Sequence, residues 1–190
     1  MTGALSGDDG LLRCAWVGST PEYLDYHDEE WGVELHGDDP MFERMSLEAF
    51  QSGLSWLTIL RKRPAFRAAF AGFDIATVAG FDSADVERLM ADAGIVRNRA
   101  KIAAVINNAQ VAAGLDEGLS ELLWGFAPDR RRRSAADSAI PSTSPESAAM
   151  AKALKRKGFR FVGPTTAYAL MQATGMVDDH DSNCWRAGAG

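Results

Sequence analysis

A short stretch of this chain gathers several side chains that could recognise a nucleobase. Between Ser46 and Trp56, the sequence places a carboxylate at Glu48, a glycine at Gly53, a leucine at Leu54 and an indole at Trp56. A carboxylate attracts a cationic group, and an aromatic face stacks on a base that has left the duplex. We predict that the rest of the chain builds a pocket and a nucleic-acid clamp around this stretch.

Tryptophan and tyrosine are concentrated in the first third of the chain. These residues are Trp16, Tyr23, Tyr26, Trp31 and Trp56. Aromatic residues usually form a core, but this set would also make a stacking pocket for a base. Glu48 does not decide between the two interpretations, because helical periodicity places it away from the face that carries Phe42 and Met45. Ordinary solvent exposure would explain that position equally well.

Two cysteines and two of the three histidines form a complete set of zinc ligands. They are Cys14, His27, His180 and Cys184. Four such ligands bind Zn²⁺ tetrahedrally with no open position, so the site would be structural and would pin the N-terminal segment to the C-terminal tail. Buried thiols and surface histidines are the competing interpretation, since neither spacing is a short paired-cysteine motif.

The elements that would position these residues are helical. Nearly every periodic segment has helical spacing and no β-branched run alternates as a strand does, which predicts an all-α protein. Asp39 and Pro40 are expected to begin a helix that ends at Gly53, and Pro64 to begin a separate short helix. Other helices are expected to begin at Ser55 and after Asp74, to cover 83–93, to run from the following hairpin to Gly114, and to cover 119–126, 145–158 and 165–175.

Residues 93–102 join two of these helices through a tight, glycine-containing hairpin. A hairpin that leads into a helix N-terminus presents unpaired backbone N–H groups, which can bind a DNA phosphate. An ordinary short connection between packed helices is the alternative, and spacing alone favours it.

The composition is that of a globular protein, with 46% hydrophobic and 24% charged residues in 190. A net charge of -6 argues mildly against nucleic acid, although basic residues cluster at 61–63, 97–101, Arg130–Arg133 and 152–160. No apolar run is long enough to cross a membrane, and we expect a cytoplasmic monomer. We expect residues 1–12 to be a disordered extension rather than a secretory signal, residues 13–185 to be one domain of two closely packed helical lobes, and residues 186–190 to be a flexible tail.

A series of motifs in this chain resembles the DNA-3-methyladenine glycosylase I family of helix-hairpin-helix DNA glycosylases. The motifs are Arg13–Val17, Tyr26–Val33, Leu47–Trp56, Ala93–Ile102, Ile140–Ser144, Lys157–Gly163 and Asp179–His180. They follow one another in register from about Arg13 to Cys184, which makes the resemblance highly specific.

The resemblance implies a helix-hairpin-helix fold and a base-excision enzyme. Such an enzyme hydrolyses the N-glycosidic bond of 3-methyladenine in double-stranded DNA that contains alkylated bases, and it releases free 3-methyladenine. The implied base pocket consists of Glu48 with Trp16, Tyr23, Tyr26, Trp31 and Trp56. The implied DNA contacts are Gly53 and Leu54, which enter the duplex, and Gly94, Arg97, Arg99 and Lys101, which hold phosphate. The implied structural Zn²⁺ is bound by Cys14, His27, His180 and Cys184.

The chain departs from the wider superfamily at its hairpin, which lacks the Leu-Pro-Gly-Val-Gly form. No residue matches the catalytic aspartate of that superfamily; Asp116 lies near the expected distance but in an unmatched segment, and it is not assigned. Two other functions stay open. One is a non-catalytic DNA-damage binding module that uses the same hairpin, and the other is a metallohydrolase with His27, Asp28, Asp179 and His180 around an open metal.

Overall fold

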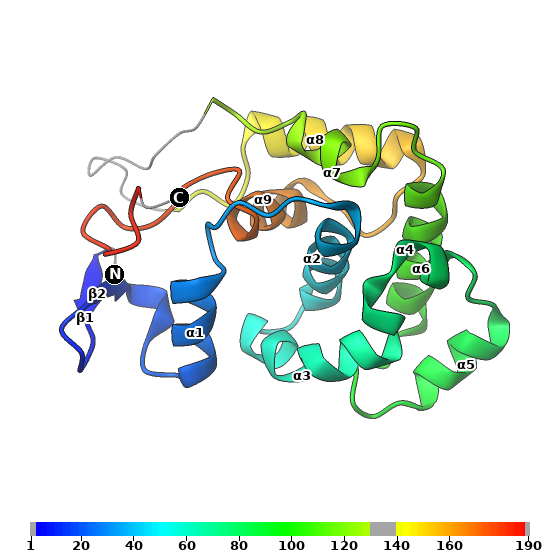
Figure 1. Cartoon of the computed structure of the whole chain (residues 1–190), viewed down its shortest axis with the longest axis horizontal. Helices are drawn as coiled ribbons and strands as arrows, with labels where there is room; N and C mark the ends of the chain where they lie inside the picture. The colour runs from blue at the N-terminus through cyan, green and yellow to red at the C-terminus, as the bar shows by residue number, and fades with distance from the viewer. Residues whose placement is uncertain (1–2, 130–139, 189–190) are drawn as a thin grey trace.

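The computed structural model describes residues 3–129 and 140–188, and within these ranges the chain is mostly helical (Figure 1). The helices are α1 (Pro21–Glu29), α2 (Asp38–Gln51), α3 (Trp56–Ala69), α4 (Ile75–Ala79), α5 (Ser83–Ala91), α6 (Arg99–Ala113), α7 (Leu119–Trp124), α8 (Pro145–Lys157) and α9 (Pro164–Ala173). Two 3₁₀ helices, η1 (Ala15–Val17) and η2 (Ala71–Phe73), complete the helical elements. The predicted helical character is thereby confirmed, while the Arg130–Arg133 run lies outside the described residues. No helix in the described ranges is long and apolar enough to cross a membrane.

Two short strands differ from the expected all-α protein. Strand β1 (Ala4–Ser6) pairs antiparallel with β2 (Leu12–Cys14), with Ala4 opposite Cys14. Asp9 fixes the turn between them, because its carboxylate accepts from the Leu11 N–H at 3.0 Å and from Arg13 at 2.9 and 2.7 Å. Strand β1 therefore lies in the segment for which the sequence predicted a disordered extension. The pattern was missed because each strand has only three residues, too few for alternation to be recognised.

Helix α2 runs through the middle of the fold, where it packs against α3, α6, α7 and α9. Its apolar residues Met41, Phe42, Met45, Leu47 and Phe50 are at most 1% exposed. These residues project in several directions around the helix, so α2 is enclosed on most sides and has no broad solvent face. Polar residues in the middle of this helix are therefore mostly buried, as Arg44, Ser46 and Glu48 are.

Several predicted helix boundaries are confirmed and two are wrong. The side chains of Ser55, Asp74 and Asp82 cap α3, α4 and α5 by accepting backbone N–H groups in the first turn. Helix α2 begins after Gly37 rather than Asp39, whose carboxylate accepts instead from the Ile75 N–H at 3.0 Å.

Pro64 does not begin a helix, because α3 continues through it. Proline removes one backbone hydrogen bond from a helix interior. Buried Ile59 and Phe66, on either side of Pro64, are both fully inaccessible, and their packing maintains α3 across this position.

Both ends of the described chain lie beside each other. In Figure 1 the C-terminal segment passes next to β1 and β2, and the Trp185 N–H donates to the Leu12 carbonyl at 2.8 Å. Cys14 and Cys184 belong to one small apolar cluster that also includes Tyr26 and Trp31. This cluster adjoins the larger core built around α2, and Trp56 packs against both.

Candidate functional site

A cavity of about 300 Å³ opens where α1, α2, α3 and α9 meet. Its walls are formed by Trp16, Tyr23, Tyr26, Trp31, Glu48, Gln51, Trp56, Ile140, Ala169 and Gln172. The structure thus brings together all five aromatic residues and the carboxylate that the sequence predicted for a base pocket.

The aromatic walls hold one another in fixed orientations. The Trp16 ring meets Tyr23 at a centroid distance of 5.7 Å and Trp31 at 5.0 Å, both edge to face, the arrangement that aromatic quadrupoles favour. Tyr26 and Trp56 contact each other with centroids 5.4 Å apart. The Tyr23 hydroxyl accepts from the Leu57 N–H at 3.1 Å, which ties this wall to the first turn of α3.

Among the described residues of the cavity wall, Glu48 is the one carboxylate, and it is only 5% exposed. Burial raises its pKa to about 8, against the attraction of the Arg44 charge. Within the described residues no hydrogen bond is made by its carboxyl group, so its oxygens are free for a group that enters the cavity. Periodicity permitted an exposed Glu48, and the structure differs because α2 is covered on most sides.

A charged network under the cavity fixes Arg44. Glu30 pairs with Arg44 and with Arg63, the latter through two bonds of 2.7 Å. Burial by itself raises the pKa of Glu30, but the Arg63 hydrogen bonds and the Arg44 charge outweigh it and hold the value at about 2. The Arg44 guanidinium is also 5.6 Å from the Tyr26 ring centroid. The network therefore places the Arg44 guanidinium, paired with Glu30, close to the side of the cavity that Glu48 lines.

Four residues of the cavity wall were not predicted from the sequence: Gln51, Ile140, Ala169 and Gln172. The Gln172 amide donates to Asp179 at 2.8 Å, which orients its side chain. Gln51 alone carried a usable signal, because it lies about one helical turn after Glu48. Ile140 begins the Ile140–Ser144 family motif, which was not connected with the pocket, while Ala169 and Gln172 come from a distant helix without a motif.

The turn between α2 and α3 carries the two residues expected to enter DNA. Gly53 adopts a φ of +81°, which favours glycine, and a Cβ added there would meet no atom within 4 Å. Leu54 is 41% exposed, and its N–H donates to the Gln51 carbonyl at 2.6 Å. The structure therefore places an exposed leucine on a tight turn between the cavity residues Gln51 and Trp56.

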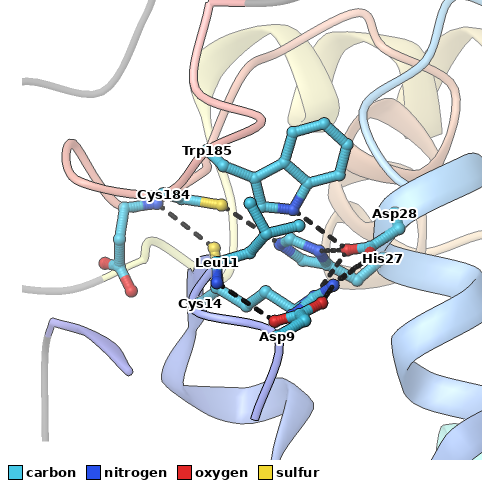
Figure 2. Close-up of polar contacts among 9 residues, drawn as sticks. Asp9, Leu11, Cys14, His27, Asp28, Cys184 and Trp185 are labelled. Atoms are coloured by element: carbon cyan, nitrogen blue, oxygen red, sulfur yellow. Dashed lines mark hydrogen bonds and ion pairs between the residues drawn. The ribbon is translucent and has the colours of Figure 1, made fainter. Parts of the chain in front are cut away.

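A separate cluster gathers two cysteines and a histidine between the two ends of the described chain (Figure 2). The ligand atoms of Cys14, His27 and Cys184 all lie within 4.8 Å of one another. Asp28 is 2.8 Å from the Nδ1 atom of His27, which leaves Nε2 to face the Cys184 sulfur at 3.3 Å. Hydrogen bonding from Cys14, together with that from His27, lowers the pKa of Cys184 and favours a thiolate.

His180 lies beside these three residues, although none of its ligand atoms is within 4.8 Å of all three. Its ring centroid is 5.2 Å from that of His27, and its Nδ1 atom is 2.9 Å from Asp178. The Nε2 atom is buried and has no hydrogen-bond partner in the described part of the chain. Two sulfurs and two imidazole nitrogens, with the far side of each ring held by a carboxylate, suit a tetrahedral metal ion. These residues therefore fit the group that the sequence implied.

The carboxylates of the alternative metallohydrolase site are engaged elsewhere. Asp28 accepts three hydrogen bonds from Arg13, the shortest at 2.6 Å. Asp179 accepts from Tyr168 and Gln172, both at 2.8 Å. Neither arrangement leaves these groups as ligands of an open metal position.

The structure does not bring the four predicted phosphate contacts together as an open site. The Gly94 N–H donates to the Asp92 carboxylate at 2.7 Å, and Arg99 forms an ion pair with Glu87 at 2.6 Å. Lys101 is only 7% exposed. Arg97 is exposed, and no ion pair involves it within the described residues.

A second hairpin, at residues 158–163, joins α8 to α9, which pack against each other. Helix α8 ends with Lys155, Arg156 and Lys157, and Gly158 follows in the left-handed conformation. Gly163 precedes α9 and offers no side chain to cap it. The first N–H groups of that helix therefore donate to no capping side chain. Phe161 is 44% exposed at the tip. The sequence analysis expected a helix on each side of this segment and matched it to the Lys157–Gly163 motif, but it predicted no hairpin, because the packing of the two helices is apparent only in the structure.

Buried Asn108 of α6 supports this second hairpin. Its amide donates to the Arg160 carbonyl at 3.0 Å and accepts from the Arg160 N–H at 2.8 Å. The adjacent Asn107 donates to the Gly158 carbonyl at 2.9 Å. The hairpin is therefore fixed to the core on one side, while its tip faces outward.

Comparisons with known proteins agree with this geometry. Residues 16–187 match the sequence profile of the family described as methyladenine glycosylase. DNA-3-methyladenine glycosylase 1 of Escherichia coli is 44% identical over 179 residues, covering 92% of this chain and 96% of that protein.

Two solved structures are similar along nearly the whole chain. A crystal structure of a 3-methyladenine DNA glycosylase I has a TM-score of 0.87 and 42% identity, covering 91% of this chain and 98% of the other. A structure described as the basis of 3-methyladenine recognition by the Staphylococcus aureus enzyme has a TM-score of 0.86 and 34% identity, with coverages of 92% and 96%.

Proposed function

Because this chain belongs to the methyladenine glycosylase family, we propose that it excises 3-methyladenine from alkylated DNA by hydrolysis of the N-glycosidic bond. The observation that carries the proposal is the cavity in which Glu48 faces inward among five aromatic side chains. Its dimensions and chemistry suit a flat, cationic ligand such as an alkylated base.

The chemistry of the lesion explains why such a cavity would suffice. Methylation of adenine at N3 gives the base a positive charge, so it is already a good leaving group. The protein therefore supplies recognition more than proton donation. Aromatic faces attract a cation, and a carboxylate pairs with it more strongly when both are removed from water.

Glu48 would discriminate between charged and neutral bases. With a pKa of about 8, its carboxyl group is mostly protonated near neutral pH in the empty cavity. Entry of a cationic base would favour the ionised form, which then accepts hydrogen bonds from the amino edge of the base. A neutral base offers no such compensation. Water attack on the oxocarbenium-like sugar centre would complete the hydrolysis.

DNA engagement would use two surfaces beside the cavity. Leu54 would occupy the space that the extruded base leaves, with Gly53 allowing the close approach of the backbone. The hairpin at 158–163 would bind a phosphate through the N-terminal N–H groups of α9, supported by the basic last turn of α8. Exposed Arg97 could add a further phosphate contact, whereas Gly94, Arg99 and Lys101 have protein partners.

The cysteine–histidine cluster would hold a structural Zn²⁺. Cys14, His27, His180 and Cys184 would be its ligands, and the ion would contribute folding energy. His27 contacts two cavity walls, with ring centroids 5.5 Å from Trp16 and 6.2 Å from Trp31. Ordering of the cluster would therefore stabilise the cavity that receives the base.

Product analysis on methylated double-stranded DNA tests the proposed activity. The wild-type protein is expected to release free 3-methyladenine and to leave abasic sites. Glu48→Gln should lower the excision rate by about 100-fold, because it keeps the size of the side chain but removes the charge that would pair with and accept hydrogen bonds from the cationic base, a loss of about 3 kcal/mol.

Glu43→Gln is the matched control, because Glu43 lies on the same helix but pairs with Arg67 outside the cavity. Its excision rate should stay close to that of the wild type. Salt-dependent binding to methylated DNA without abasic product would refute the enzymatic proposal and identify a damage-binding module instead.

A further inference from the structure

Lys101 makes a contact that its predicted role in phosphate binding does not explain. It lies in the first turn of α6, yet its side chain is directed into the protein and it is 7% exposed. Its ammonium group donates to the Phe50 carbonyl at 2.9 Å and to the Ser52 carbonyl at 2.6 Å. Both acceptors belong to the C-terminal end of α2 and the turn that follows it.

The acceptors are groups that a helix leaves unpaired. The last four carbonyls of an α-helix have no partner within the helix, and the C-terminal end carries a partial negative charge. A buried ammonium group donates hydrogen bonds to these unpaired carbonyls and also neutralises the partial negative charge of the helix end. Lys101 is itself fixed, because its N–H donates to the Asn98 side chain at 3.1 Å. Lys101 therefore connects the beginning of α6 to the end of α2.

The turn held in this way lies between the important side chains of the site. Glu48 precedes it on α2, Gly53 and Leu54 form it, and Trp56 begins α3 after it. We propose that Lys101 is a positioning residue that holds this turn rigid, so that Leu54 can enter the duplex while Glu48 and Trp56 keep their places in the cavity. This inference rests on the proposed excision function. It also separates Lys101 from the phosphate contacts, since both of its identified acceptors are protein carbonyls.

We call the contact of Lys101 with the Phe50 and Ser52 carbonyls the clamp. Lys101→Met tests this clamp, because it keeps an unbranched side chain but removes the charge and the donors. Lys101→Arg keeps both and should retain most of the function. Lys62→Met is the matched control, since the Lys62 ammonium also donates to two turn carbonyls, of Ala93 and Gly94, at 3.1 and 3.0 Å. Three quantities are measured for each variant: amide hydrogen exchange, the excision rate on duplex DNA, and the salt dependence of DNA binding.

The clamp predicts a specific pattern in these measurements. In Lys101→Met, amides in residues 50–56 should exchange faster and duplex excision should fall by about 10- to 100-fold, as expected for misplaced site residues. The slope of log affinity against log salt concentration should be unchanged. Lys62→Met should accelerate exchange around residues 92–96 while residues 50–56 keep the wild-type rate.

Wild-type exchange over residues 50–56 in Lys101→Met would overturn the clamp. So would a salt slope that falls by about 1, because that change identifies a phosphate contact. If Lys101→Met does not fold, Lys101→Gln, which retains one donor group, provides the same exchange comparison. A wild-type protein that releases no 3-methyladenine refutes the proposed function, whereas the exchange data still decide whether the clamp exists.

Discussion

The sulfur of Cys184 lies 3.3 Å from the Nε2 atom of His27, although 157 positions separate the two residues in the chain. Cys14 shares this cluster, and His180 brings a second buried imidazole whose Nε2 atom has no partner within the described residues. These positions support the proposed structural Zn²⁺ site with four ligands.

Metal analysis should therefore find close to one equivalent of zinc per chain. Cys184→Ser should lose the metal and lower the melting temperature, because binding free energy at a structural site contributes to folding. His36→Ala is the control, since His36 is a histidine outside the cluster with a side chain that is 62% exposed. It should keep full zinc content. Full zinc content in Cys184→Ser would contradict the assigned ligand set.

Glu48 should make the stability of the protein depend on pH in a predictable direction. Its pKa is raised from 4.5 to about 8 by burial, so the folded state binds this proton more tightly than the unfolded chain does. The contribution of Glu48 to the free energy of unfolding therefore falls as the pH rises between these values, by up to about 1.4 kcal/mol per pH unit. Relative to the wild type, Glu48→Gln should gain stability from about pH 5 to about pH 8.

Chemical denaturation at several pH values measures this difference, since other titrating groups contribute equally to both proteins. Glu43→Gln should show no comparable gain, because the Glu43 carboxylate pairs with Arg67 at 2.8 Å. Parallel stability curves for the wild type and Glu48→Gln would show that Glu48 titrates normally.

Leu54→Ala should slow excision from duplex DNA by about tenfold. The leucine side chain would fill the space of the extruded base and so offset part of the few kcal/mol that unstacking the base costs. The affinity for free 3-methyladenine should not change, as Leu54 is not part of the cavity wall. Excision from a single-stranded oligonucleotide should be affected much less. Leu5→Ala, which alters a leucine that is 59% exposed on β1, is the control and should act like the wild type on both substrates. Equal losses on duplex and single strand would exclude a wedge role.

Asn108→Ala should destabilise the protein by about 1–3 kcal/mol, because it removes two hydrogen bonds that a buried amide makes to Arg160. Asn107→Ala removes a bond to Gly158 from a more exposed position and should cost less. Urea denaturation of both variants gives the comparison. If the hairpin at 158–163 binds phosphate, Asn108→Ala should also weaken DNA binding. Equal stability losses in the two variants would argue against a special role for Asn108.

The comparisons confirm the predicted family and enzyme class, and local signals also predicted much of the secondary structure. Caps such as Ser55 and Asp82 were predictable because capping depends on residues close in sequence. The clustering of aromatic residues likewise indicated a pocket, and those residues do line one cavity.

Other features depend on which elements approach each other in space. Glu48 is buried because other helices enclose α2, and Lys101 points inward because α6 meets the end of α2. The burial of Glu48 and the direction of Lys101 cannot be predicted from the spacing of residues within their own helices. The hairpin at 158–163 was underestimated for the same reason, since its support comes from Asn108 on a distant helix.

The joining of β2 to the segment around Cys184 also has a consequence for synthesis. A ribosome makes the chain from its N-terminal end, so Cys14 and His27 emerge long before Cys184 reaches them. Until then, the Trp16 and Trp31 walls that contact His27 lack their final support. The cavity lined by Glu48 and Gln172 is therefore among the last parts of the protein to be completed during synthesis.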